Sequence, residues 1–192
     1  TPSREITHRV DVRDYADFKR AALAAHASQA TGADVRTLGA LLRLPRPIFR
    51  SDDWKQYRTV NERFADALAE EVDSEDPIVL VQDYHFALAP RLIRERLPRA
   101  TVMMFWHIPW PNSERFAICP WREQLLEGML GASIVGFHTQ AHCNNFLGAV
   151  DRLLEARIDR EQNAVVQQGR GTLVRPYPIS LEWPVRWLAS EP

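Results

Sequence analysis

Three short apolar runs alternate with amphipathic segments through the middle of this chain, and this alternation constrains the fold more than any other feature. The apolar runs span Ile78–Val81, Thr101–Trp106 and Ser133–Phe137, and helical patterns follow at about Phe86–Leu97, Trp121–Leu130 and Gln140–Leu154. Strands that are apolar throughout are typical of parallel sheets covered on both faces, and the helices between them supply the crossovers. We therefore predict an α/β fold with a Rossmann-like parallel sheet and flanking helices.

The segments on either side of this alternation add helices and a hairpin to the prediction. A long amphipathic helix is expected from Ser51 to Val72, after a proline-rich break at residues 45–47. The segments Val165–Gln168 and Leu173–Tyr177, separated by Gly169-Arg170-Gly171, predict a β-hairpin or two short strands. Residues 1–47 form a separate helical segment, with helices expected at 14–30 and 35–44.

Composition excludes several classes of partner. The 192 residues carry 24 basic and 25 acidic side chains, a net charge of −1. Nucleic-acid and anionic-membrane binding need a basic excess or a basic stripe, so neither partner is expected. No apolar run reaches the roughly 18–20 residues of a membrane span. Two cysteines, Cys119 and Cys143, are too few for a disulfide scaffold, which is typical of a reducing, cytoplasmic location.

Polar side chains follow each of the three predicted strands. Asp83, Tyr84 and His85 come after the first strand, His107 after the second and His138 after the third. The carboxyl ends of neighbouring parallel strands meet at one edge of a sheet, and open α/β sheets bind their ligands there. The sequence therefore predicts one ligand site built from these residues.

Each of these residues also has a structural interpretation. Asp83 precedes a predicted helix, so its carboxylate could cap that helix, contact a ligand, or do both. His107 leads into Ile-Pro-Trp-Pro, a stiff loop that would hold the imidazole at the site, and this favours a function. His138 and His142 bracket the start of a helix, which favours packing or hydrogen bonding.

Other chemistries lack their motifs. His138, His142 and Cys143 have the spacing of metal ligands on one helical turn, but no second ligand pair or nearby carboxylate completes a zinc site. There is no Gly-x-Ser-x-Gly elbow, no Walker loop and no Gly-x-Gly-x-x-Gly loop. We therefore expect neither a metal nor a cofactor.

A set of motifs resembles trehalose-6-phosphate synthase in order and spacing. The resemblance covers about residues 48–184, where a Rossmann-like acceptor-side domain is expected, and residues 185–192 would begin an interdomain segment. The motifs are Trp54-x-x-Tyr57-x-x-Val60-Asn61, Gln82-Asp83-Tyr84-His85, Phe105-Trp106-His107-Ile108-Pro109-Trp110-Pro111-Asn112-Ser113-Glu114, Trp121-Arg122-Glu123, Gly136-Phe137-His138-Thr139 and Tyr177-Pro178-Ile179-Ser180.

That resemblance implies a function. The family consists of retaining glycosyltransferases of the two-domain GT-B fold, which transfer glucose from UDP-glucose to glucose 6-phosphate without a metal. This chain would then be the N-terminal half of a GT-B fold. The resemblance makes Asp83 and His107 the catalytic residues: Asp83 would hold hydroxyls of the acceptor sugar, and His107 would contact the donor glucose near the transferring carbon. The substrate-binding residues that it implies are Trp54, Tyr57, Tyr84, His85 and His138.

The sequence departs from the family pattern in the elements that bind both substrates. The first strand and its Gly-Gly loop, which help to grip the acceptor phosphate, have no counterpart in residues 1–47. Gln82 replaces the usual histidine before Asp-Tyr-His, and Ser180 replaces the usual glycine of Pro-Ile-Gly. The C-terminal nucleotide-binding domain, which supplies Arg and Lys for the diphosphate, is missing from these 192 residues. We therefore expect this chain alone to be inactive.

Two alternative functions stay open. A glucosylglycerol-phosphate synthase shares these motifs and uses glycerol 3-phosphate as acceptor. A non-catalytic domain that binds a sugar phosphate or a partner protein is the alternative from another class. The apolar segment Trp183–Leu188 resembles an interdomain crossing, and its exposure would favour self-association, so a homo-oligomer is also open.

Overall fold

The computed structural model describes residues 48–179. The chain divides into two compact units, Thr1–Gln56 and Tyr57–Pro192, and each is described by itself. The helices predicted at 14–30 and 35–44 and the interdomain segment predicted at 185–192 lie outside the described residues.

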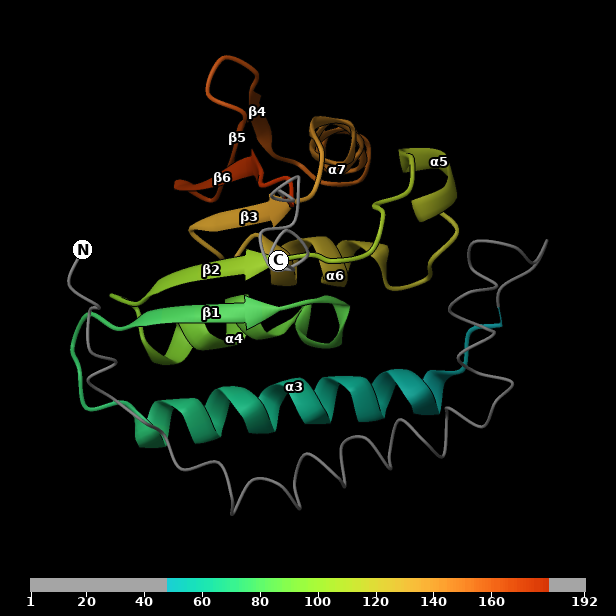
Figure 1. The fold of residues 1–192 in the computed structure, drawn as a ribbon. Coiled ribbons are helices and arrows are strands. Elements are labelled where there is room, and N and C mark those ends of the chain that lie inside the picture. The colour runs from blue at the N-terminus through green and yellow to red at the C-terminus, as the bar shows by residue number, and fades with distance from the viewer. Residues whose placement is uncertain (1–47, 180–192) are drawn as a thin grey trace, which may run out of the picture. The chain divides into compact units, whose positions relative to one another are not determined.

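A mixed six-stranded sheet lies at the centre of the second unit (Figure 1), with the strand order β1-β2-β3-β6-β5-β4. Its first four strands in that order are parallel, and the last two continue it antiparallel. This confirms the α/β fold with a parallel sheet. The strands are β1 (Ile78–Gln82), β2 (Thr101–Phe105), β3 (Ile134–Phe137), β4 (Arg157–Asp159), β5 (Ala164–Gln167) and β6 (Arg170–Pro176).

Helices connect the parallel strands and pack against the sheet. Helix α4 contacts β2 and α6, and helix α7 contacts β3 and β6. In Figure 1 the arrowheads of β1, β2 and β3 point the same way, and α5 lies beyond that end. Helix α3 begins in the first unit and continues into the second. The helices are α3 (Ser51–Glu71), a 3-10 turn η1 (Tyr84–Phe86), α4 (Ala89–Arg96), α5 (Ser113–Phe116), α6 (Arg122–Met129) and α7 (Gln140–Leu153).

The apolar core lies between the sheet and these helices. Val102 and Met104 of β2 and Val135 and Phe137 of β3 are at most 1% exposed. Phe146 of α7 reaches Phe137 with ring centroids 5.3 Å apart. Burial of such side chains contributes roughly 1.5–3 kcal/mol each relative to exposure, so this layer holds the parallel strands in place.

One face of β1 is open, contrary to the prediction of a sheet covered on both sides. Ile78 and Leu80 are 74% and 65% exposed, whereas Val81 is 6% exposed. The run Ile-Val-Leu-Val contains only apolar residues, so its sequence shows no alternation of apolar and polar residues. The helices of the described residues cover one face of this strand.

The remaining differences between the predicted and the observed elements lie at turns and in short elements. The helix expected from Phe86 starts as the separate turn η1, and Pro90 then lies in the first turn of α4, where its missing N–H costs nothing. The predicted hairpin is confirmed: Gln168 and Gly169 form its two-residue turn, both with positive φ, as a type I′ turn requires. Strand β4 and helix α5 are too short to show a periodic pattern in the sequence, so neither was predicted.

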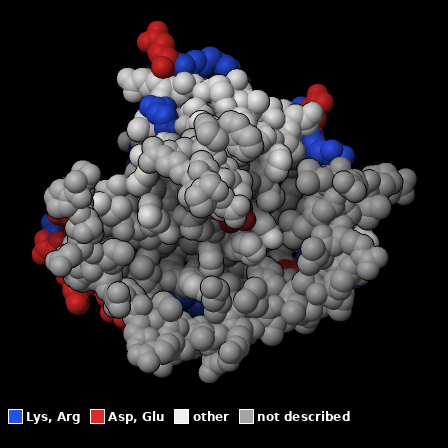
Figure 2. Space-filling view, in the orientation of Figure 1, with Lys and Arg blue, Asp and Glu red and all other residues white. Residues whose placement is uncertain are grey.

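Charges of both signs are spread over the described surface. In Figure 2 basic and acidic side chains lie near one another at the rim, and the described part of this face carries no extended basic patch. No helix among residues 48–179 is long and apolar enough to cross a membrane.

Candidate functional site at the carboxyl ends of the parallel strands

The predicted polar residues meet at one edge of the sheet. Gln82, the last residue of β1, pairs with Phe105 of β2, and Phe105 pairs with Gly136 of β3. Asp83 and His107 therefore follow neighbouring strand ends, and the His107 and His138 ring centroids lie 5.9 Å apart. The sequence prediction that the strand ends bring these side chains together is confirmed.

Asp83 has an unusual backbone conformation. Its φ is 66° and its ψ is 176°, a combination adopted almost only by glycine, which costs another residue about 1–3 kcal/mol. Its N–H donates to the carbonyl of Phe105 (2.7 Å), and its carboxylate Oδ1 accepts from the backbone N–H of His107 (3.1 Å). Although Asp83 stands at the start of η1, its side chain makes no capping hydrogen bond. Of the two interpretations, helix capping by the carboxylate is therefore wrong.

His107 is held from two sides. Its Nε2 lies 2.7 Å from Oε1 of Gln82, and its ring meets the Phe105 ring edge-on, with centroids 4.8 Å apart. An imidazole that donates its Nε2–H to Gln82 keeps Nδ1 as an acceptor. The exposed His107 ring can therefore offer one nitrogen to a ligand while Gln82 orients the other.

Tyr57 and Asn61 of α3 hold the loop that follows Asp83. The Tyr57 hydroxyl donates to the carbonyl of Tyr84 (2.6 Å) and accepts from the N–H of Ala87 (2.9 Å). Burial raises the pKa of Tyr57 far above its ordinary value, so the hydroxyl stays protonated. Both contacts hold the loop in place, and substrate binding by Tyr57 stays a prediction.

Asn61 is fully buried, and although it belongs to the Trp54-x-x-Tyr57-x-x-Val60-Asn61 motif, it is not among the predicted site residues. Its Nδ2 donates to the carbonyl of His85 (3.1 Å), and its Oδ1 accepts from the N–H groups of Leu88 (3.2 Å) and Ala89 (3.0 Å). Those two N–H groups lie at the start of α4, where backbone donors have no partner within the helix. A polar residue on the apolar face of the α3 pattern was the signal that could have identified it.

Tyr84 and His85 lie side by side in that loop. Their rings stack with centroids 4.0 Å apart, and Tyr84 also lies edge-on to Trp106 at 6.3 Å. Burial, and then the negative charge of Asp83, raises the pKa of Tyr84. The Tyr84 hydroxyl therefore stays protonated and can donate a hydrogen bond.

The loop after His107 is anchored by a buried tryptophan. Trp110 is 2% exposed and packs on the rings of Phe137 and Phe146. Asn145 of α7 donates to the carbonyl of Trp110 (3.2 Å), and Asn112 caps α5. These contacts anchor the loop after His107 to the core, and Trp106, which precedes the loop, is also buried.

His138 and His142 occupy the start of α7. The His138 ring meets Phe105 edge-on with centroids 4.9 Å apart, and the N–H of His142 donates to the capping hydroxyl of Thr139 (3.3 Å). Trp54, the remaining predicted binding residue, lies near the start of α3 in the unit that ends at Gln56. Among the described residues no three His, Cys, Asp or Glu side chains gather as metal ligands do.

Gly136 makes the strand ends fit closely. A Cβ at this position would lie 2.8 Å from Cδ2 of Tyr177 and 2.9 Å from Cδ2 of Phe105. Phe105 is the residue on which both His107 and His138 pack. A glycine here therefore lets Tyr177 close over the ring that supports the two histidines.

Comparisons with known proteins agree with this geometry. The profile of glycosyltransferase family 20 matches residues 44–185. Trehalose-6-phosphate synthase of Mycolicibacterium vanbaalenii is 40% identical over 144 residues, 71% of this chain and 29% of that protein. Validamine 7-phosphate valienyltransferase of Streptomyces hygroscopicus subsp. jinggangensis is also 40% identical over 144 residues, with the same coverage of 71% and 29%. The chain spans 15% to 29% of the length of the first curated relatives that it matches.

Solved structures share the fold. The structure described as trehalose-6-phosphate from E. coli bound with UDP-2-fluoro glucose has a TM-score of 0.75 and 26% identity, and the match covers 89% of this chain and 38% of that one. The N-terminal domain of Candida albicans trehalose-6-phosphate phosphatase has a TM-score of 0.67 and 29% identity, over 74% of this chain and 31% of that one.

Proposed function

Because this chain belongs to glycosyltransferase family 20, we propose that residues 48–179 form the acceptor-side domain of a glycosyltransferase that moves glucose from UDP-glucose to glucose 6-phosphate with retention. One observation carries the proposal: Asp83 and His107 lie at the neighbouring ends of β1 and β2, where the backbone N–H of His107 donates to the Asp83 carboxylate and Gln82 holds the His107 imidazole. A carboxylate and a fixed imidazole suit a reaction that depends on holding two sugars.

Asp83 would hold the acceptor sugar. Its Oδ1 is oriented by the N–H of His107, which leaves Oδ2 to accept hydrogen bonds from ring hydroxyls. Tyr84, next along the chain, keeps its phenolic proton because burial raises its pKa. The two side chains offer an acceptor and a donor to a polyhydroxylated ligand.

His107 would contact the donor sugar near the carbon that is transferred. In the proposed step the acceptor oxygen forms a bond to that carbon as the bond from the carbon to the diphosphate oxygen breaks. The proton of the attacking hydroxyl passes to the leaving diphosphate on the same face of the ring, which retains the configuration. The protein contributes positioning and charge stabilisation.

The transfer reaction also needs positive charge beside the diphosphate of the donor. Neutralising a developing diphosphate calls for fixed cations, and Asp83, Tyr84 and His107 supply none. We therefore propose that a nucleotide-binding domain completes the site and that the 192-residue chain alone does not turn over. UDP release from UDP-glucose and glucose 6-phosphate at the rate of two-domain relatives would contradict this part.

Ligand titration by NMR tests acceptor binding directly. We expect glucose 6-phosphate to shift the amide resonances of Asp83, Tyr84 and His107 saturably in the 192-residue chain. Asp83→Asn keeps an acceptor for the His107 N–H and tolerates positive φ, so it should fold normally and lose most of the response. The matched control is Asp73→Asn, an exposed carboxylate beyond α3. Equal responses in the two variants, or none in the wild type, would overturn the proposal.

The identity of the acceptor distinguishes a trehalose-6-phosphate synthase from the alternative transferases. A relative named for valienyl transfer to validamine 7-phosphate is as similar to this chain as a relative named for trehalose-6-phosphate synthesis, so overall identity does not select the substrate. Competition among glucose 6-phosphate, validamine 7-phosphate and glycerol 3-phosphate for the Asp83-dependent response would rank them. A response to glycerol 3-phosphate alone would favour the glucosylglycerol-phosphate synthase alternative.

A further inference from the structure

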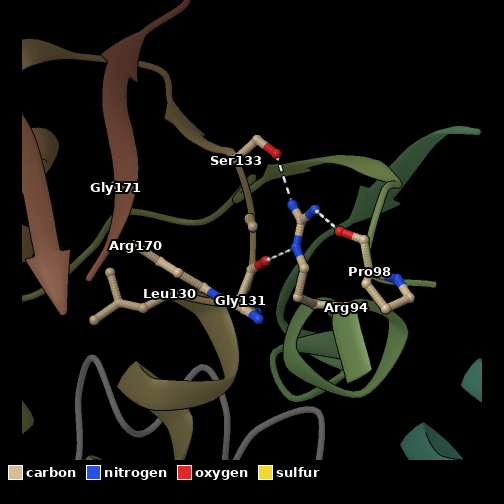
Figure 3. A pocket seen from close by; sticks show the side chains of 8 residues that line it. Arg94, Pro98, Leu130, Gly131, Ser133, Arg170 and Gly171 are labelled. Atoms are coloured by element: carbon tan, nitrogen blue, oxygen red, sulfur yellow. Dashed lines mark hydrogen bonds between the residues drawn. The ribbon is translucent and has the colours of Figure 1, made fainter. Parts of the chain in front are cut away.

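A cavity of about 340 Å³ lies at the opposite end of the parallel strands from Asp83 and His107 (Figure 3). Pro98 and Ser133 in its lining shortly precede β2 and β3, whereas the catalytic candidates follow those strands. We propose that this cavity is a second ligand site, which binds an oxyanion of the phosphate class between the guanidinium groups of Arg94 and Arg170. The inference does not depend on the proposed transfer reaction.

Arg94 of α4 forms the inner wall. Its Nε donates to the carbonyl of Gly131 (3.3 Å), its Nη1 to the carbonyls of Pro98 (3.2 Å) and Ala100, and its Nη2 to the hydroxyl of Ser133 (2.7 Å). These bonds fix the plane of the guanidinium group. A guanidinium has five N–H donors, so four are used and one on Nη2 stays available.

Contacts to β6 and to α4 hold the Leu130–Ala132 loop, which faces Arg94. The Thr172 hydroxyl lies within hydrogen-bond distance of the carbonyls of Leu130 (3.0 Å) and Ala132 (2.8 Å). A Cβ on Gly131 would lie 2.3 Å from Cα of Arg91, so α4 touches the loop at that residue. A site whose walls are already held loses little conformational entropy when a ligand binds.

Arg170 supplies a second positive charge. It starts β6 and is exposed, and it lines the same cavity as Arg94, beside Gly131 and Ser133 (Figure 3). Neither guanidinium forms an ion pair with a carboxylate among residues 48–179, and no acidic side chain lines the cavity. Burial, and then the positive charge of Arg170, lowers the pKa of Arg94, as two like charges that line one cavity repel each other.

A bound oxyanion would relieve that repulsion. Arg170 can give two parallel N–H groups to it, the free Nη2–H of Arg94 a third, and Ser133, which accepts from Arg94, keeps its own hydroxyl hydrogen to donate. The cavity exceeds the size of inorganic phosphate, so a small phosphate monoester would also fit. Structural arginines are usually neutralised by nearby carboxylates, and here an anion from solution takes that place.

Titration with inorganic phosphate tests the site. We expect saturable shifts of the Gly131, Ser133 and Gly171 amide resonances in the 192-residue chain at constant ionic strength, with binding about ten-fold weaker in Arg170→Gln, which removes a charged bidentate partner. Arg170→Lys keeps a point charge and should lie between the two. The matched control is Arg63→Gln, an exposed arginine of α3 outside the cavity lining, and it should bind phosphate as the wild type does.

A second ligand and a variant at Asp83 complete the test. Titration with glycerol 2-phosphate tests whether the bound oxyanion is free phosphate or part of a phosphorylated metabolite. Binding tighter than that of inorganic phosphate indicates a phosphorylated metabolite. Binding at least ten-fold weaker indicates free phosphate. Asp83→Asn should leave the response intact, so failure of the proposed transferase site does not remove this one. Shifts that do not saturate, or equal weakening in Arg63→Gln and Arg170→Gln, would show general charge screening and overturn the proposal.

Discussion

The carboxylate of Asp83 accepts a hydrogen bond from the backbone N–H of His107, 3.1 Å away and 24 residues further along the chain. Asp83 holds this position with a φ of 66°. A strained residue whose side chain fixes the next strand end is typical of a functional site, where the surrounding structure maintains a conformation that the residue itself disfavours.

Substitutions at Asp83 should separate strain from function. Asp83→Gly relieves the left-handed strain and loses the bond to His107, so the free energy of unfolding should stay within about 1 kcal/mol of wild type. Asp83→Ala keeps the strain and loses the bond, and it should be about 1 kcal/mol less stable than Asp83→Gly. Urea unfolding measures both, and an alanine variant at least as stable as the glycine variant would contradict the strain argument.

Gln82→Leu should release the imidazole of His107. The leucine removes the acceptor 2.7 Å from Nε2, so the population of the Nε2-protonated tautomer should fall, as seen in the ring nitrogen chemical shifts. The His138 ring serves as the internal control, because it packs on Phe105 and has no bond to Gln82. Unchanged His107 ring shifts would mean that Gln82 does not orient the ring.

Asn61→Leu should be strongly destabilising. It removes the acceptor for the N–H groups of Leu88 and Ala89 and the donor to the carbonyl of His85. Leaving buried backbone groups unpaired costs about 1–3 kcal/mol each, so we expect a loss of at least about 3 kcal/mol in urea unfolding. Asn144→Ala, at an exposed position of α7, should change stability by less than about 0.5 kcal/mol.

Two glycine-to-alanine variants should have opposite effects. Gly136→Ala forces a methyl group against Phe105 and Tyr177, and overpacking of this kind costs about 1–3 kcal/mol. Gly148→Ala places its methyl group where no atom lies within 4 Å, inside α7, and should stabilise the helix by about 0.5–1 kcal/mol. Thermal unfolding of the two variants compares them directly, and a neutral Gly136→Ala would argue against the close fit of Tyr177.

Stability should fall at alkaline pH through Cys143. Burial raises the pKa of this thiol to about 11 from an unfolded value of 9.0. The folded state therefore holds the proton more tightly, and this contribution is complete below pH 9 and is lost as the pH rises toward 11. The slope of the unfolding free energy between pH 9 and 11 should be shallower in Cys143→Ala, and identical slopes would contradict the prediction.

The sequence predicted which side chains lie together at the strand ends better than the exact role of each side chain. Apolar strands followed by Asp83, His107 and His138 were enough to place these residues at one edge, because the carboxyl ends of parallel strands meet there. The sequence left open whether the Asp83 carboxylate caps a helix, because both roles need the same residue type before a helix. Its positive φ and its bond to His107 decided between them.

The sequence by itself therefore determined which segments become strands and helices, and which polar residues follow them. Only the tertiary structure decided which distant groups satisfy one another. Asn61 bonds to the start of α4, Gln82 orients His107, and Arg94 and Arg170 share a cavity. Periodicity reports burial along one element, whereas hydrogen bonds between elements depend on distances and angles that exist only after the elements have packed.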